Sequence, residues 1–387
     1  MSAETALGAA AEHYVARLER ARAAASAGRC VIGLVGADVP RELIAAAGAL
    51  PYRLHSGGLP PSEEAVRLLG AAIDPVAPVL LTQLLAGELD FLAGLVFSRD
   101  CEASLQLFYV VRELSARRPG LPPVHLVDLL HLPRESTVRY DRAQVEACAE
   151  VLASWTGRAP EGEALLEAMN RYRALRAELV HAQELRRDGR LGGRDSLHLF
   201  AAADSLDADD AASLIRAAVA ERQGAAPTAA RHLFFSGSSQ DDDAVYAALE
   251  SLGLHIVGED HDWGQLQLTV DTSPASADPL DVLAAAYHRR GPAAASSSIG
   301  ERAAWSAGQA RSAGAEGVLC YTRAFDDAPA WDYPVQREHL HRVGIASVLL
   351  DRQPLDPHPE ALREAVDGLF GTAAPETAEA DTAVSTR

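Results

Sequence analysis

Cys101 lies at the predicted start of a helix, between Asp100 and Glu102. The positive end of the helix dipole lowers the pKa of a thiol at such a position, and a lower pKa makes the thiol a better ligand or nucleophile. A small, partly buried cysteine without a chemical role is the structural alternative. The position therefore makes Cys101 a candidate cofactor-binding residue.

Two aspartates that are far apart in the sequence also lie where a ligand could bind. Asp74 precedes a proline at the start of the helical run 76–85, and Asp326 lies shortly before the helical run 331–342. Both positions are typical of helix caps, which is the structural interpretation. Loops at the carboxyl ends of strands also form the ligand crevice of open α/β sheets. If Asp74, Cys101 and Asp326 meet in that crevice, they form a candidate metal site.

Other polar residues could bind an anion. Ser236 and Gly237 follow an apolar strand and precede a helix, so their backbone amides could bind a phosphate or a thioester. The three consecutive aspartates at 241–243 would repel a phosphate at the same place. An arginine at the end of a short strand, and a serine and an arginine at a later helix start, could pair with an anion or could be solvated. The candidate substrate-binding residues are Arg53, Ser236, Gly237, Ser298 and Arg302.

Two further observations limit the chemistry. The segment 259–262, Glu-Asp-His-Asp, carries metal-capable side chains, but loops at strand ends are often polar, and we favour ordinary loop structure there. The sequence contains no G-x-S-x-G elbow, P-loop lysine motif or G-x-G-x-x-G fingerprint. These absences argue against the usual hydrolases, P-loop NTPases and dinucleotide-binding proteins.

Strands and helices alternate along most of the chain. Short apolar runs such as 30–35, 95–98 and 124–127 are typical of buried strands, and helical patterns separate them. The sequence therefore predicts an α/β fold with two Rossmann-like or flavodoxin-like parallel-sheet domains and a helical linker domain. The predicted parts are an N-terminal helix (1–29), a first α/β domain (30–140), a helical domain (141–229), a second α/β domain (230–371) and a disordered tail (372–387).

Charge and cysteine content exclude several classes of partner. The chain of 387 residues carries 54 acidic and 35 basic side chains, which gives a formal net charge of -19. Such a charge repels nucleic acids and anionic membranes, and an anionic substrate would need a locally positive pocket. The four widely spaced cysteines form no C-x-x-C pair, which argues against a disulfide framework or a zinc ribbon. Since no segment has the pattern of a signal peptide or a membrane span, we expect a cytoplasmic protein.

Five segments carry a resemblance to a known family: 31–54 (VIGLVGADVPRELIAAAGALPYRL), 89–97, 231–237, 252–260 and 316–327. In this order they resemble a subunit of the 2-hydroxyacyl-CoA dehydratase and benzoyl-CoA reductase family, over about residues 29–351. Members of that family hold a [4Fe-4S] cluster with three cysteines. By this resemblance the three cysteine positions fall on Asp74, Cys101 and Asp326, so two of the three are aspartates here.

The resemblance also implies partners and a reaction. In the family, an ATP-dependent activator delivers an electron, and a cluster-bearing dimer passes it to an acyl-CoA thioester. Our first hypothesis is a divergent subunit that binds an acyl-CoA or related substrate and pairs with a homologous cluster-bearing subunit or with itself, as part of a lyase. A [4Fe-4S] cluster or other metal bound by this chain would instead make it an enzyme of its own. A non-catalytic acyl-CoA-binding or regulatory protein is the third alternative.

Overall fold

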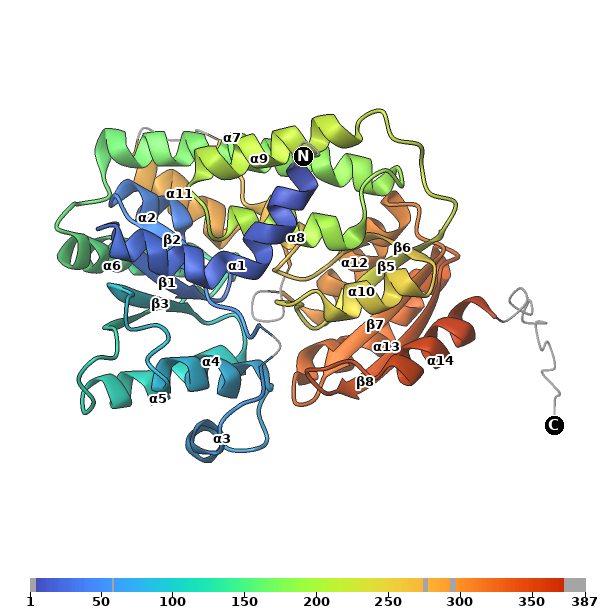
Figure 1. The fold of residues 1–387 in the computed structure, drawn as a ribbon, viewed down its shortest axis with the longest axis horizontal. Helices are drawn as coiled ribbons and strands as arrows, with labels where there is room; N and C mark the ends of the chain where they lie inside the picture. The colour runs from blue at the N-terminus through green and yellow to red at the C-terminus, as the bar shows by residue number, and fades with distance from the viewer. Residues whose placement is uncertain (1–4, 58, 274–277, 293–296, 372–387) are drawn as a thin grey trace, which may run out of the picture.

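The computed structural model describes residues 5–57, 59–273, 278–292 and 297–371. Its strands form two four-stranded parallel sheets, one in each of two α/β units, and a layer of helices lies along both units (Figure 1). The predicted fold class is confirmed. The predicted tail at 372–387 lies outside the described residues.

The first α/β unit consists of β1 (Val31–Val35), α2 (Arg41–Ala46), β2 (Leu50–Arg53), α3 (Glu63–Leu69), α4 (Val76–Leu85), β3 (Gly94–Ser98), α5 (Glu102–Ser115) and β4 (Val124–Val127). The sheet has the strand order β2-β1-β3-β4. The central strand β1 is apolar and buried along its whole length, as expected for a parallel strand that is covered on both faces. Gly33 is needed there because a Cβ atom would lie within 2.8 Å of both Leu92 and Leu95.

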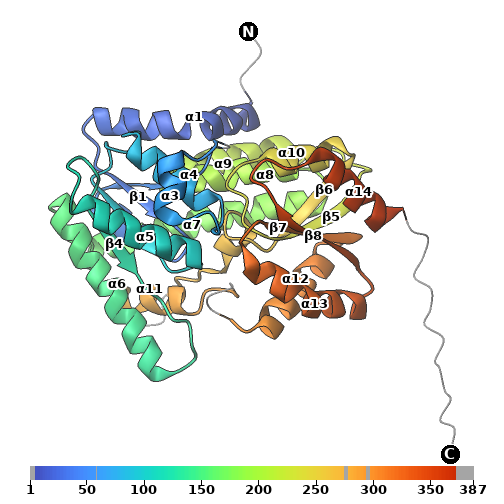
Figure 2. The ribbon, with the colours of Figure 1, turned by 90° about the horizontal axis from the view of Figure 1, so that it is seen from below.

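The helical unit consists of α1 (Ala6–Ser26), α7 (Gly162–Arg187), α8 (Gly193–Ala203) and α9 (Ala208–Arg222), whereas α6 (Glu135–Thr156) packs on β4 and α2 of the first unit. Helices α7, α8 and α9 pack on one another around buried leucine and alanine side chains. Helix α1 lies along one edge of the molecule and contacts α8 and α9 (Figure 2). Its Arg17 donates from Nη2 to the carbonyl oxygen of Asp241, 2.9 Å away, so α1 also contacts the second α/β unit.

The second α/β unit consists of β5 (Arg231–Gly237), α10 (Ala244–Ser251), β6 (Leu254–Glu259), α12 (Ile299–Ser312), β7 (Gly317–Arg323), α13 (Asp327–Arg342), β8 (Ala346–Gln353) and α14 (Pro359–Phe370). The sheet has the strand order β6-β5-β7-β8. Its buried core gathers aromatic side chains, including Phe235, Tyr246 and Tyr321, around the central strands. The two sheets therefore repeat one strand arrangement, with the first strand of each unit in an inner position.

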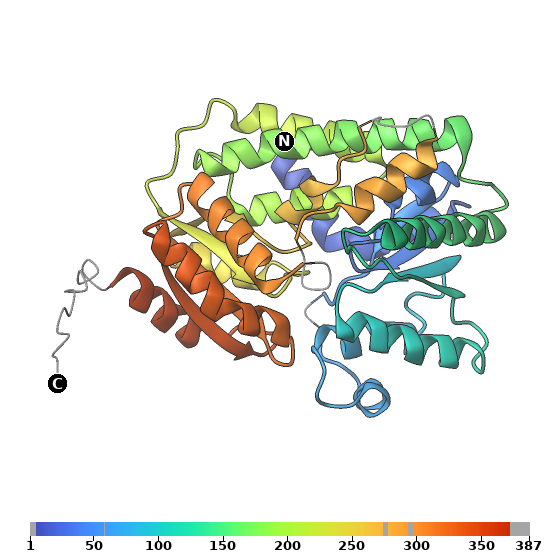
Figure 3. The ribbon, with the colours of Figure 1, turned by 180° about the vertical axis from the view of Figure 1, so that it is seen from behind.

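One segment inside the second unit returns to the first. After the 3-10 helix η1 (Gln265–Thr269), the chain forms α11 (Pro279–His288), which packs on α6 and α7 (Figure 3). Leu283 and Tyr287 are buried in the same core as β1 and α2. The Tyr287 hydroxyl donates to Glu42 Oε2 at 2.9 Å. The range predicted as one continuous second domain is therefore interrupted, because the apolar face of α11 completes the core of the first unit.

No helix among the described residues is both long and apolar enough to cross a membrane.

Candidate functional site

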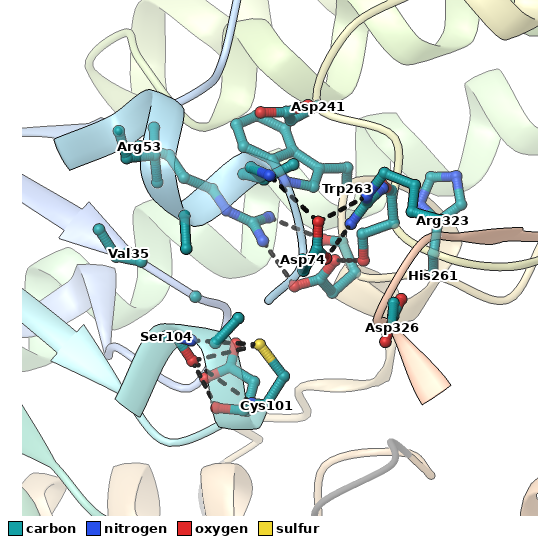
Figure 4. Close-up of a pocket in the computed structure, with 18 of the residues that line it drawn as sticks. Val35, Arg53, Asp74, Cys101, Ser104, Asp241, His261, Trp263, Arg323 and Asp326 are labelled. Atoms are coloured by element: carbon teal, nitrogen blue, oxygen red, sulfur yellow. Dashed lines mark hydrogen bonds and ion pairs between the residues drawn. The ribbon is translucent and has the colours of Figure 1, made fainter. Parts of the chain in front are cut away.

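A cavity of about 200 Å³ lies between the two α/β units. Val35 at the end of β1 and Arg323 at the end of β7 line it (Figure 4). Gly237 at the end of β5 lines it as well. Asp74, two residues before α4, and Cys101, directly before α5, contribute from the first unit. The cavity therefore occupies the place where parallel α/β sheets usually bind ligands, outside the carboxyl ends of their strands.

Both apolar and polar side chains line the cavity. Most of the apolar ones come from the first unit and include Val35, Leu54, Val76, Ala77, Leu80 and Leu107. Polar side chains come from both units, and those of the second include Asp241, Asp260, Asp262, Arg323 and Asp326. Ligand sites commonly combine such an apolar lining with a few convergent polar groups.

Asp74 forms an ion pair with Arg323. Arg323 donates from Nε to Asp74 Oδ1 at 2.9 Å and from Nη2 to Asp74 Oδ2 at 2.8 Å, and both side chains are buried. Asp74 Oδ1 also accepts a hydrogen bond from the backbone amide of Val76, the first residue of α4, at 3.1 Å, although Pro75 and not Asp74 is the N-cap residue. The bidentate geometry fixes the Asp74 carboxylate, and no oxygen of it is left without a donor.

Cys101 is the N-cap residue of α5. Its Sγ accepts from the backbone amide of Ser104 at 3.4 Å, and Ser104 Oγ accepts in return from the Cys101 amide. The side chain lines the cavity and keeps part of its surface exposed. Desolvation by the surrounding protein raises the pKa of the thiol to about 12, and Asp100 adds to the shift. The expected lowering by the helix dipole is wrong, because burial outweighs it.

Asp326 directly precedes α13, but its side chain does not cap the helix. The carboxylate faces the cavity instead, and Oδ2 accepts from the Ser238 hydroxyl at 2.5 Å. Burial raises the pKa of Asp326 to about 6, and the nearby Asp74 carboxylate adds to the shift. Phe325, one residue earlier, has a φ of 66°, an unfavourable backbone conformation for an aromatic residue. The predicted capping role of Asp326 is wrong, and this turn directs its carboxylate toward Ser238.

Asp74, Cys101 and Asp326 line one cavity, but their chemistry does not fit a [4Fe-4S] cluster. Iron–sulfur clusters are held by thiolates, and here the only thiol in the set has a raised pKa. The Asp74 carboxylate is bound by Arg323. Among the described residues, no group of three or more histidine, cysteine, aspartate or glutamate side chains is arranged to hold a metal ion. Metal binding by these three residues stays a prediction.

Arg53 is buried at the cavity and bridges the units. Its Nη2 donates to Asp262 Oδ2 at 2.6 Å, and its Nη1 lies 3.3 Å from Asp204 Oδ2. The guanidinium lies over the ring of Trp263, 4.0 Å from the centroid. Arg53 is therefore part of the cavity wall and not a solvated surface residue. The acidic loop 259–262 contributes to the same wall, through Asp260, His261 and Asp262.

The remaining candidates line a neighbouring cavity or lie on the surface. Ser236, Gly237 and Arg302 line a cavity of about 90 Å³ that shares Gly237 and Asp260 with the main one. The Gly237 amide donates to Asp260 Oδ1 at 3.1 Å, so this amide is not available to a phosphate. Arg302 pairs with Asp332. Ser298 is exposed and caps α12 in a capping box with Glu301.

Sequence reasoning missed several residues of the cavity, namely Asp100, Trp263, Arg290 and Arg323. Arg290 follows α11 and donates to Asp38 Oδ1 at 2.5 Å. Arg323 is the last residue of β7. The rule that ligands bind at the carboxyl ends of parallel strands would have pointed to Arg323 if the strand end had been known.

The fold and the site define a class: a two-unit α/β protein with a ligand cavity at the carboxyl ends of two parallel sheets. Residues 37–370 match the family described as 2-hydroxyglutaryl-CoA dehydratase, D-component. Because the match covers most of the chain, the chain belongs to this family, and the resemblance inferred from the sequence is confirmed. A comparison with curated proteins finds no match.

Proposed function

We propose that the chain is a subunit of a lyase of the 2-hydroxyacyl-CoA dehydratase type and binds the acyl end of a CoA thioester between its two α/β units. The supporting observation concerns the residues at the three positions that the resemblance assigns to cluster cysteines and the contacts that these residues make. Asp74 pairs with Arg323, Cys101 pairs with Ser104, and Asp326 accepts from Ser238. At the three positions where a cluster would need free ligands, each side chain is therefore already hydrogen-bonded or ion-paired to another protein group.

A homologous cluster-bearing subunit is the proposed partner, with an ATP-dependent activator as the source of the electron. A second copy of this chain would bring the same single thiol and the same two carboxylates. A homodimer would therefore lack the thiolate ligands that an iron–sulfur cluster requires. This reasoning favours a heterodimer in which this chain binds substrate and the partner carries out the electron transfer.

The size of the cavity supports binding of an acyl group. Sites for drug-sized ligands commonly measure about 300–1,000 Å³. At about 200 Å³, the cavity between the units has room for a short acyl chain but not for the nucleotide of CoA. The thioester would therefore enter acyl end first, with the nucleotide outside.

The walls suggest how the thioester would be oriented. The methylene groups of the acyl chain would lie against Val76, Leu80 and Leu107, away from water. The Cys101 thiol keeps its proton at neutral pH and faces the cavity, so it can donate to the thioester carbonyl oxygen.

The experiment combines metal analysis with ligand binding. Protein purified without oxygen, and its Cys101→Ala variant, are assayed for iron, acid-labile sulfide and zinc, and are titrated with butanoyl-CoA. We expect both proteins to be free of stoichiometric metal, and we expect the wild type to bind the thioester. Iron and sulfide near cluster stoichiometry that disappear in Cys101→Ala would contradict the proposal, and so would a folded wild type that binds neither butanoyl-CoA nor another short acyl-CoA.

A further inference from the structure

The cavity carries more negative than positive side chains. Among the described residues that line it, the arginines are Arg53, Arg290 and Arg323, and the aspartates are Asp74, Asp100, Asp241, Asp260, Asp262 and Asp326. The aspartates outnumber the arginines two to one. The locally positive pocket that an anionic substrate would need is therefore not what the structure contains.

Each of these arginines is already paired with an aspartate. Arg323 pairs with Asp74 and Arg53 with Asp262. Arg290 pairs with Asp38, which lies behind the cavity wall. A guanidinium that turned toward a ligand carboxylate would leave its own buried aspartate unpaired, which costs several kcal/mol. The arginines therefore hold the cavity together and do not form a site for an anion.

The carboxylates differ in how fully the protein satisfies them. Asp241 accepts from both the amide and the hydroxyl of Ser56. Asp260 accepts from several donors, among them the Ser306 hydroxyl at 2.6 Å and the Gly237 amide. For Asp326, by contrast, the Ser238 hydroxyl is the one hydrogen-bond donor to the carboxylate within the described part of the chain. Asp326 is therefore the carboxylate with the most capacity for a ligand.

The pKa values of two aspartates in the cavity agree with the excess of negative over positive side chains. Burial raises the pKa of Asp326 to about 6, with the Asp74 carboxylate as the next cause. Burial also raises the pKa of Asp100 to about 6, with Asp38 as the next cause. Both shifts express the cost of adding negative charge to this space. A bound cation would offset that cost, whereas a bound carboxylate would increase it.

We infer that the acyl group bound in this cavity ends in a primary ammonium group, held by Asp326, and that acyl groups ending in a carboxylate are rejected. The lining fits such a ligand, since Leu80 and Leu107 offer apolar surface to a short methylene chain and Asp326 offers a carboxylate to its charged end. This inference rests on the proposed function, because it names the substrate class for the same cavity.

Three thioesters with the same two-methylene chain provide the test. β-Alanyl-CoA ends in an ammonium group, butanoyl-CoA in a methyl group and succinyl-CoA in a carboxylate. Because all three share the CoA moiety, its repulsion by the protein's net charge cancels in the comparison. We expect calorimetric titration of the full chain to give affinities in the order β-alanyl, butanoyl, succinyl, with at least about a tenfold difference at each step.

A matched pair of variants assigns the preference to one residue. Asp326→Asn removes the charge but keeps the shape, and we expect the ratio of β-alanyl-CoA to butanoyl-CoA affinity to fall to near one. Asp188→Asn removes an exposed aspartate at the C-terminal end of α7, outside the cavity, and should leave the ratio unchanged.

The outcomes separate this inference from the proposed function. Equal affinities for the three thioesters, or an unchanged ratio in Asp326→Asn, would overturn the ammonium preference alone. If the folded wild type binds none of the three, the proposed function fails and the ammonium preference fails with it. If Asp326→Asn does not fold, the order of the three affinities in the wild type still tests the ammonium preference.

Discussion

Arg323 and Asp74 lie 249 residues apart in the sequence and form a bidentate ion pair across the interdomain cavity. Arg323 ends β7 in the second α/β unit, and Asp74 precedes α4 in the first. The pair therefore ties the two units together at the cavity wall. Its Asp74 member occupies a position that the family resemblance assigns to a cluster cysteine.

Arg323→Ala should destabilise the protein strongly. The substitution leaves the Asp74 carboxylate buried without its cation, which typically costs about 3–5 kcal/mol. Urea denaturation of the variant measures the loss in the free energy of unfolding. Arg342→Ala, which breaks an exposed pair with Glu338 on α13, is the control and should cost less than about 1 kcal/mol. Equal losses for the two variants would show that the buried pair contributes no more than a surface pair.

Replacing both partners should restore much of the lost stability. In the double variant Asp74→Leu/Arg323→Met, no buried charge remains unpaired, and such replacements are often neutral. We expect the double variant to be more stable than Arg323→Ala alone. A double variant that is less stable than either single variant would mean that the pair does more than satisfy two buried charges.

Much of the fold could be predicted from local sequence. The run 124–127 forms β4 with the predicted bounds, because a mainly apolar run with two valines follows two prolines. Helix α5 begins directly after Cys101, as expected, because Cys101 and Ser104 cap each other's backbone amides in a capping box. These features depend on neighbours within a few residues, so they can be predicted from the local sequence alone.

The residues that were missed or misjudged depend on distant partners. Strand β7 continues to Arg323 because that residue still pairs with Gln353 of β8, and a polar strand end cannot be told from a loop in the sequence. The pKa of Cys101 follows from desolvation in the cavity between the units, which the helix-start pattern does not contain. The charge of the cavity likewise results from loops that are brought together only by the fold.

The ionisation of Asp326 should make stability depend on pH. Its pKa is about 6 in the folded protein and about 3.9 in an unfolded chain, so between these values the folded state binds the extra proton. Stability from this group is therefore present at low pH and is lost as pH rises toward 6. Urea denaturation at several pH values measures this. The free energy of unfolding of Asp326→Asn, relative to the wild type, should increase from pH 4 to pH 6 and level off above.

Subtracting the wild type is necessary because Asp100 and Asp242 also have a pKa raised to about 6, in each case first by burial. Their contributions are common to both proteins and cancel. A difference between the two proteins that is constant across this range would mean that Asp326 has an ordinary pKa, and a difference that decreases would mean that its pKa is lowered.

The Cys101 thiol should react slowly with iodoacetamide. Alkylation requires the thiolate, and with a pKa of about 12 only about one thiol in ten thousand is ionised at pH 8. We expect a rate at least about a hundredfold below that of a free thiol, measured by peptide mass spectrometry. Urea-unfolded protein serves as the control and should react at the ordinary rate, whereas rapid alkylation of the folded protein would indicate a thiolate.

Helix α11 should stabilise the first α/β unit although its sequence lies within the second. Leu283 on α11 is fully buried in the core that contains β1 and α2, and Leu249 on α10 is fully buried in the core of the second unit. Truncating either leucine to alanine should cost about 2–5 kcal/mol. Hydrogen exchange distinguishes them, since local opening is faster where packing is lost. Leu283→Ala should accelerate exchange mainly in α6 and β1, and Leu249→Ala mainly in β5 and β6. If Leu283→Ala instead affected β5 and β6 first, α11 would belong energetically to the second unit, and the return of the chain to the first unit would contribute little to stability.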